Sequence, residues 1–188
     1  MGARRPGVRW PGCKVNGCKR RLKIYLLTII LALGWIVLIC LPPWLMAAGQ
    51  FTLAQIGYQS FSIICHQIPE RSWEIAGLPL AVCSRCTAIY VGGLAGLLLH
   101  PLTRLHGGWL RPAGLSKGWL ALALLPMLAD VAFDLLGLRT NTFLTRTITG
   151  GLAGIALALY LTPTILAAGD EWRRGSAPYQ TGDNRHEQ

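Results

Sequence analysis

The stretch Ile24–Ala48, IYLLTIILALGWIVLICLPPWLMAA, contains no charged residue and is interrupted only by Pro42-Pro43 near its end. A helix needs about 20 consecutive apolar residues to cross the hydrocarbon core of a bilayer. The stretch is therefore long enough to span a membrane. Its apolar core exceeds the ~7–15 residues usual in a cleaved signal peptide, so we expect a retained signal anchor.

Three further apolar stretches follow, at about Thr87–Leu99, Trp119–Leu138 and Ile148–Ala168. The second of the four is short unless the preceding Ala81–Cys86 turn belongs to the same helix. Hydrophobic residues make up 52% of the 188 residues and charged residues only 14%, too few to cover a soluble surface. The sequence predicts one domain, an all-α integral membrane protein with about four transmembrane helices.

The positive charge is strongly biased to one side of these four crossings. Fourteen of the 18 Lys and Arg residues lie before Ile24, between the second and third stretches, or in the tail. The positive-inside rule then places both termini in the cytoplasm of a multi-pass cell-membrane protein. We expect a basic cytoplasmic tail over residues 1–23, a membrane domain over 24–168 and a polar cytoplasmic tail over 169–188.

The net charge of +10 fits attraction to the lipid bilayer and to anionic lipid. It is accompanied by no nucleic-acid recognition motif, so no nucleic-acid partner is expected. With the N-terminus inside, residues 49–82 face outward. Within them, Phe51–Ile64 is too polar to span, but its apolar residues recur at helical spacing. We expect an interfacial helix on the outer face, ended by Pro69.

Soft metal ligands gather on the same outer side. Cys83 and Cys86 lie about one helical turn apart, and Cys65 and His66 could complete a Cys₃His set in which softness and charge favour zinc. Neighbouring side chains diverge, so one of Cys65 and His66 is expected to be a ligand and the other a catalytic or supporting group. The alternatives to a metal site are a redox or structural disulfide and simple buried thiols.

Two aspartates and several arginines accompany this site. Asp130 and Asp134 share one helix face, and carboxylates inside an apolar helix are unfavourable unless they are paired or line a wet cavity. They are candidate catalytic groups with His66, or else partners in a structural ion pair. Five residues are candidates for binding an anionic substrate: Arg71, Arg85, Arg139, Asn141 and Arg146. Alternatively, the arginines only balance the charge of the nearby acidic residues.

A short glycine pattern occurs twice. Gly92-Gly93-Leu94-Ala95-Gly96 recurs as Gly150-Gly151-Leu152-Ala153-Gly154, and each copy has the Gly-xxx-Gly spacing that lets helix backbones approach closely. If the two faces pack together, Cys83 and Cys86 come near Arg146.

The run Cys65-His66-Gln67-Ile68-Pro69-Glu70-Arg71-Ser72, followed by Leu78-Pro79-Leu80-Ala81-Val82-Cys83-Ser84-Arg85-Cys86-Thr87-Ala88-Ile89-Tyr90, resembles a known family. The chain is similar, over roughly residues 50–160, to the bacterial and archaeal membrane proteins grouped as domain of unknown function 2085. The family usually has glycine where this chain has Ala88. The resemblance implies a multi-helix membrane domain and supplies no activity.

Three functions are therefore open at this stage, and whether the protein is an enzyme is one of the open points. The first is metal-assisted hydrolysis or transfer on an anionic lipid-type substrate or small-molecule ligand at a zinc site. The second is a thiol–disulfide oxidoreductase coupled to a membrane quinone, with Cys83 and Cys86 as the exchanging pair. The third is an ion- or proton-coupled carrier or accessory subunit. The sequence does not define the oligomeric state.

Overall fold

The computed structural model describes residues 15–105, 117–138 and 141–175. Within these ranges the chain forms five α-helices, one 3₁₀ turn and a two-stranded hairpin. The helices are α1 Val15–Ala47, α2 Phe51–Ser62, α3 Ser84–Leu105, α4 Lys117–Leu135 and α5 Phe143–Gly175. The 3₁₀ turn is η1 Pro69–Arg71, and the strands are β1 Glu74–Ile75 and β2 Leu78–Pro79.

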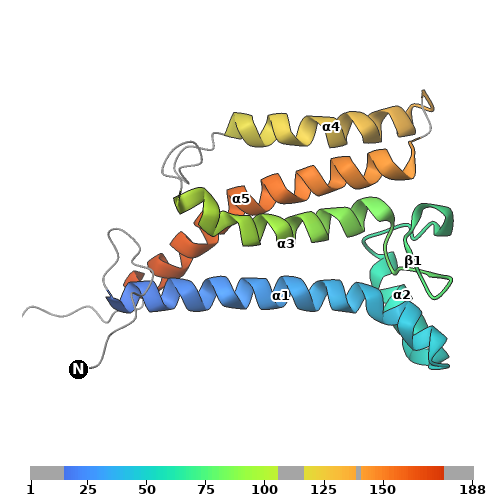
Figure 1. The fold of residues 1–188 in the computed structure, drawn as a ribbon, viewed down its shortest axis with the longest axis horizontal. Coiled ribbons are helices and arrows are strands. Elements are labelled where there is room, and N and C mark those ends of the chain that lie inside the picture. The colour runs from blue at the N-terminus through green and yellow to red at the C-terminus, as the bar shows by residue number, and fades with distance from the viewer. Residues whose placement is uncertain (1–14, 106–116, 139–140, 176–188) are drawn as a thin grey trace, which may run out of the picture.

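The four long helices run side by side in the order α4, α5, α3, α1 (Figure 1). The first residues of α1 and the last of α5 lie at one end of this row. The short helix α2, the hairpin and the start of α3 lie at the opposite end, as do the last turn of α4 and the first of α5. The all-α membrane fold with a separate short helix, expected from the sequence, is confirmed.

The observed helix ends differ from the predicted ranges. The helix α1 begins nine residues before Ile24, α5 continues to Gly175, and α3 begins at Ser84, within the turn that precedes Thr87. By contrast, α4 ends at Leu135, three residues before the predicted end at Leu138. The short helix α2 ends at Ser62, before Pro69, because the chain leaves the helix to form the loop that contains Cys65.

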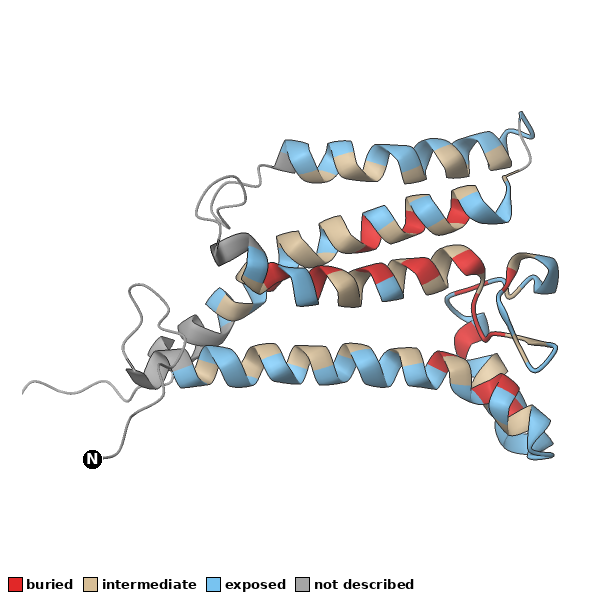
Figure 2. Ribbon diagram, viewed as in Figure 1, coloured by how far each residue is buried: buried red, intermediate tan, exposed pale blue. Residues whose placement is uncertain are grey.

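Three of the described helices are long and apolar enough to cross a membrane: Lys19–Ala47, Gly118–Leu135 and Phe143–Ala168. The remaining predicted span, the second in the chain, is α3. It has 22 residues and a length of about 33 Å, but Arg85 and His100 lower its hydropathy. Large apolar side chains cover the outer faces of α1 and α4, where residues such as Leu31 and Leu122 are exposed (Figure 2). Such a surface is stable against lipid hydrocarbon.

The two glycine runs face each other between α3 and α5, as the sequence indicates. A methyl group at Gly150 would lie 2.7 Å from the carbonyl oxygen of Arg85, and one at Gly96 would lie 2.8 Å from that of Ile155. A methyl at Gly154 would strike the carbonyl oxygen of Ile89. No side chain fits at these three positions, so the helix backbones touch directly there.

We expect Gly154→Ala to lower the free energy of unfolding by about 1–3 kcal/mol, because the added methyl group forces the helices apart. Gly34→Ala is the matched control, since a methyl group at Gly34 meets nothing within 4 Å. Alanine is the better helix former, so the control should be unchanged or slightly more stable. Thermal unfolding in mild detergent measures both variants. Equal midpoints would show that the glycine contact is not tight.

Candidate metal centre

A β-hairpin returns the chain from Cys65 to Cys83. Its strands pair antiparallel, Glu74 opposite Pro79 and Ile75 opposite Leu78. The two residues between them, Ala76 and Gly77, have φ angles of 54° and 74°. Positive φ at both central positions is typical of the type I′ turn, whose twist matches that of the flanking strands. The hairpin thus folds residues 66–82 into a compact loop at the end of the helix row.

Gln67 ties the two cysteine-bearing segments together. Its Nε2 donates hydrogen bonds of 2.7 Å to the carbonyl oxygens of Tyr58 and Ala81. It has a φ of 50°, a conformation that few non-glycine residues adopt. The side chain therefore joins α2 to the segment that leads into α3, and the unusual backbone conformation is compensated by these two bonds.

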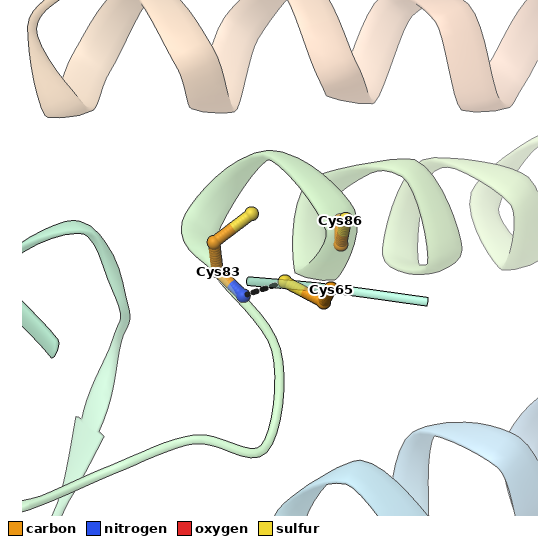
Figure 3. Close-up of side chains that lie close together, drawn as sticks. All are labelled: Cys65, Cys83 and Cys86. Atoms are coloured by element: carbon orange, nitrogen blue, oxygen red, sulfur yellow. Dashed lines mark hydrogen bonds between the residues drawn. The ribbon is translucent and has the colours of Figure 1, made fainter. Parts of the chain in front are cut away.

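Three cysteine sulfurs meet where these segments join (Figure 3). The Sγ atoms of Cys65, Cys83 and Cys86 all lie within 4.8 Å of one another, and the three residues are free thiols. Cys65 is buried beneath the loop, and its Sγ accepts a hydrogen bond of 3.1 Å from the backbone N–H of Cys83. With Zn–S bonds of about 2.3 Å, the sulfurs of a tetrahedral site lie ~3.8 Å apart. A small contraction would thus seat one zinc ion among them.

The environment favours the thiolate form of Cys83. Hydrogen bonds from the thiols of Cys65 and then Cys86 hold its pKa well below the usual range, against the opposing effect of burial. The backbone N–H groups of Cys86 and Arg85, at the start of α3, lower the pKa further. A thiolate is the form that binds metal or acts as a nucleophile.

His66 is not part of this sulfur group. Its side chain is exposed, and the set of described residues close enough to share a metal ion contains the three cysteines without it. Adjacent side chains diverge, so the burial of Cys65 turns its neighbour toward the surface. The roles of His66 as a ligand or catalytic group stay predictions.

Both aspartates of α4 form ion pairs with arginines. Arg85 Nη2 donates to Asp130 Oδ2 at 2.6 Å. Arg146 Nη2 lies 3.1 and 3.0 Å from the two carboxylate oxygens of Asp134, and Arg71 Nη1 lies 3.3 Å from Oδ2 of the same residue. These bonds link α4 to α3, α5 and the loop. The structure thus places the candidate catalytic acids against arginines and outside the sulfur group.

The arginines retain free donors around these pairs. The Nε atoms of Arg85 and Arg146 and the hydroxyl of Ser84 are buried and have no hydrogen-bond partner among the described residues. The side chain of Asn141 donates to the backbone carbonyl of Asp130. Arg139 lies outside the described residues. In the described part of this ion-pair cluster, three arginines pair with two aspartates, so the cluster carries one more positive than negative charge.

Three residues of this region are not among the sequence-based candidates. Gln67 lies within the Cys-His-Gln motif, but a lone glutamine has no characteristic spacing that signals a bridging role. Ser84 lies inside Cys-Ser-Arg-Cys, and its burial could not be inferred without the fold. Tyr90 packs against the hydrophobic cluster that holds the cysteines, four residues after Cys86. A spacing of four residues places Tyr90 on the same helix face as Cys86, and this was the signal by which the sequence could have identified it.

We expect Asp130→Asn to lower the free energy of unfolding by about 3–5 kcal/mol, because it leaves the Arg85 guanidinium buried without a counter-charge. The side chains of Arg85 and Asp130 are only 16% and 10% exposed. Glu70→Gln is the control, since Glu70 is exposed in η1. Unfolding in detergent would be followed by circular dichroism. Equal stability of the two variants would argue against a structural role for the Asp130 charge.

Comparison with known proteins agrees with this architecture. The family described as "Predicted membrane protein (DUF2085)" matches residues 65–160, which include all three sulfurs and both aspartates. An uncharacterised protein of Methanocaldococcus jannaschii is 35% identical over 146 residues, 75% of this chain and 92% of the relative. An uncharacterised protein of Methanothermobacter thermautotrophicus is 36% identical over 102 residues, 53% of this chain and 85% of the relative. No solved structure matches the chain significantly. The chain therefore belongs to the DUF2085 family of membrane proteins.

Proposed function

We propose that the protein is a membrane metalloprotein in which Cys65, Cys83 and Cys86 bind one zinc ion. The observation that supports this most directly is the meeting of three sulfurs from two separate segments within 4.8 Å. Three thiolates form a soft donor set, which suits zinc better than calcium or magnesium. The lowered pKa of Cys83 supplies one ligand in its deprotonated form.

A site with three protein ligands differs from a purely structural zinc site. Structural sites have four protein ligands, whereas catalytic sites have three and leave the fourth position for water or substrate. The grouped cysteines provide three, and the exposed His66 follows Cys65 in the sequence. We therefore propose metal-assisted hydrolysis or transfer, in which zinc would supply Lewis-acid polarisation of the substrate.

The substrate in this proposal has an anionic head. The buried N–H groups at Nε of Arg85 and Arg146 and the hydroxyl of Ser84 are unused donors near the start of α3. The excess positive charge of the ion-pair cluster favours an anion there. In this arrangement Arg85 and Arg146 orient the anionic head beside the sulfur group, while Asp130 and Asp134 hold the two guanidinium groups in place.

A second candidate function is thiol–disulfide exchange with a membrane quinone. It is favoured by the low pKa of Cys83 beside the free thiol of Cys86. Oxidation would join the Cys83 thiolate and the Cys86 thiol in a disulfide and release two electrons and one proton. These electrons, with that proton and a second one taken from water, would reduce the quinone to a quinol. Cys65 would relay electrons from a dithiol substrate through mixed disulfides.

Metal analysis separates these functions. We expect the full chain, purified in mild detergent without chelator, to contain about one zinc per chain. Cys83→Ser and Cys65→Ser should lose it, because each removes a thiolate ligand. Cys40→Ser is the control, since Cys40 is a free thiol of α1 outside the sulfur group. Inductively coupled plasma mass spectrometry measures the content. Absence of metal from the wild type, with an oxidisable Cys83–Cys86 pair, would favour the quinone-coupled function.

Gln67 provides an independent test of how the site is held. We expect Gln67→Ala to weaken zinc binding by about 10–100-fold, as is typical when a residue that positions ligands is removed. The variant loses both hydrogen bonds that fix the cysteine segments. Gln59→Ala is the matched control, because Gln59 is exposed on α2. Competition with a chromogenic chelator gives the affinities. Equal affinities would mean that Gln67 does not position the ligands.

A further inference from the structure

An apolar cavity lies between α1, α3 and α5, in the middle of the helix row. Its volume is about 390 Å³. Its walls include Trp35, Tyr90, Gly93, Gly154, Leu161 and Ile165. Thr28 and Thr162 also line it, but each hydroxyl donates to a carbonyl of its own helix, at 2.9 and 2.6 Å. The cavity therefore offers hydrocarbon surface and suits an apolar ligand.

The shape of the cavity follows from how the three helices meet. Glycines bring α3 and α5 into backbone contact, so one wall has little side-chain bulk. The helix α1 touches α3 at two levels, through the Trp35–Tyr90 ring contact at 5.9 Å and the Tyr25 hydroxyl, which donates to the Leu97 carbonyl at 2.6 Å. Residues 25 and 35 are about 15 Å apart along the helix. Between them lies an elongated groove.

One end of this groove adjoins the sulfur group. Tyr90 lines the cavity and also packs against the cluster that contains Cys65, together with Cys83 and Cys86. It follows Cys86 by four residues and so shares its face of α3. A chain-shaped molecule in the groove would point its end toward Tyr90 and the sulfur group beyond it.

We propose that the groove binds one hydrocarbon chain of a membrane lipid whose polar head lies at the Cys65–Cys83–Cys86 group. This rests on the proposed function, because the lipid head is the substrate of that site. Hydrocarbon gains little by moving from the bilayer into an apolar groove. The head therefore provides the affinity, and the groove selects a lipid by accepting a single chain and aligning it.

Two glycine substitutions test the groove. A side chain at Gly93 has room, since the nearest atom to an added Cβ is the Gly154 carbonyl oxygen at 4.0 Å, and Gly93 lines the cavity. Because the Cβ itself meets no close atom, we expect the rest of the side chain in Gly93→Leu to extend into the groove and fill it. Gly34→Leu makes the same change at an exposed position of α1 that does not line the cavity. Ala32→Leu blocks the groove from the α1 wall and serves if Gly93→Leu does not fold.

The probe is a palmitic acid with a diazirine in its chain, added to vesicles that contain the full-length protein. After irradiation, mass spectrometry of peptides locates the labelled residues. We expect labelling of the cavity walls in the wild type and in Gly34→Leu, and its loss in Gly93→Leu and Ala32→Leu. Undiminished wall labelling in both blocked variants would overturn the groove, as would label confined to the outer face of α4.

Zinc content measured on the same samples separates the two proposals. Zinc-containing protein without wall labelling would overturn the lipid groove and leave the metal site standing. Wall labelling that responds to Gly93→Leu in metal-free protein would support the groove and overturn the metal site. Full zinc content in Gly93→Leu, together with lost labelling, supports both proposals and shows that the variant is folded.

Discussion

Backbone contact between the glycine runs of α3 and α5 determines where the other elements lie. Because Gly150 fits against the carbonyl of Arg85, the first turn of α3 is held beside the first turns of α5. That contact brings Arg85 and Arg146 to the same region, where Asp130 and Asp134 of α4 can neutralise them. It also fixes the helix start at which Cys83 and Cys86 stand. A wider separation would leave charged groups in an apolar setting without partners.

At the end of the bundle where α3 begins, two kinds of polar groups lie on different sides. On the α4 side, carboxylates and guanidinium groups compensate one another and attach a helix that has few buried residues. On the side of α1 and α2, soft sulfur atoms are enclosed by an apolar cluster that includes Ile39 and Phe61. The start of α3 belongs to both sides, since Cys83 and Cys86 flank Ser84 and Arg85 in the sequence. A ligand at this helix end can therefore meet soft donors and positive charge together.

Much of the fold could be predicted from the sequence because lipid imposes simple rules. Apolar length located the helices, and the repeated glycine spacing indicated which helices touch. Placing both motifs on one side of the membrane made a meeting of Cys65 with Cys83 and Cys86 reasonable without establishing it, and the structure brings the three sulfurs together. Helix ends were less accurate, as in α1 and α5, because polar sequence can continue a helix outside the apolar span.

The rest depended on contacts that have no local sequence signal. The Gln67 bridge joins carbonyl groups 9 and 14 residues away, and backbone acceptors exist at every residue. The choice of Arg85 for Asp130 and of Arg146 for Asp134 is set by the rotation of α4 against its neighbours. The divergence of Cys65 and His66 was expected from their adjacency, but which of the two joins the sulfurs depends on the direction of the chain after α2. Each of these three features can be known only from the three-dimensional arrangement of the chain.

The hairpin has a consequence for how this end of the protein can vary. Its tip, Ala76-Gly77, is exposed, whereas the segment that positions the cysteines is fixed by Gln67 and by the Tyr58 hydroxyl, which donates to Pro79. Exposed tips of this kind accept added residues readily. Residues can therefore be inserted at the tip without moving the sulfurs, and related chains can differ there in length. The tip is also a suitable point for attaching a reporter that tells on which side of the membrane the hairpin lies.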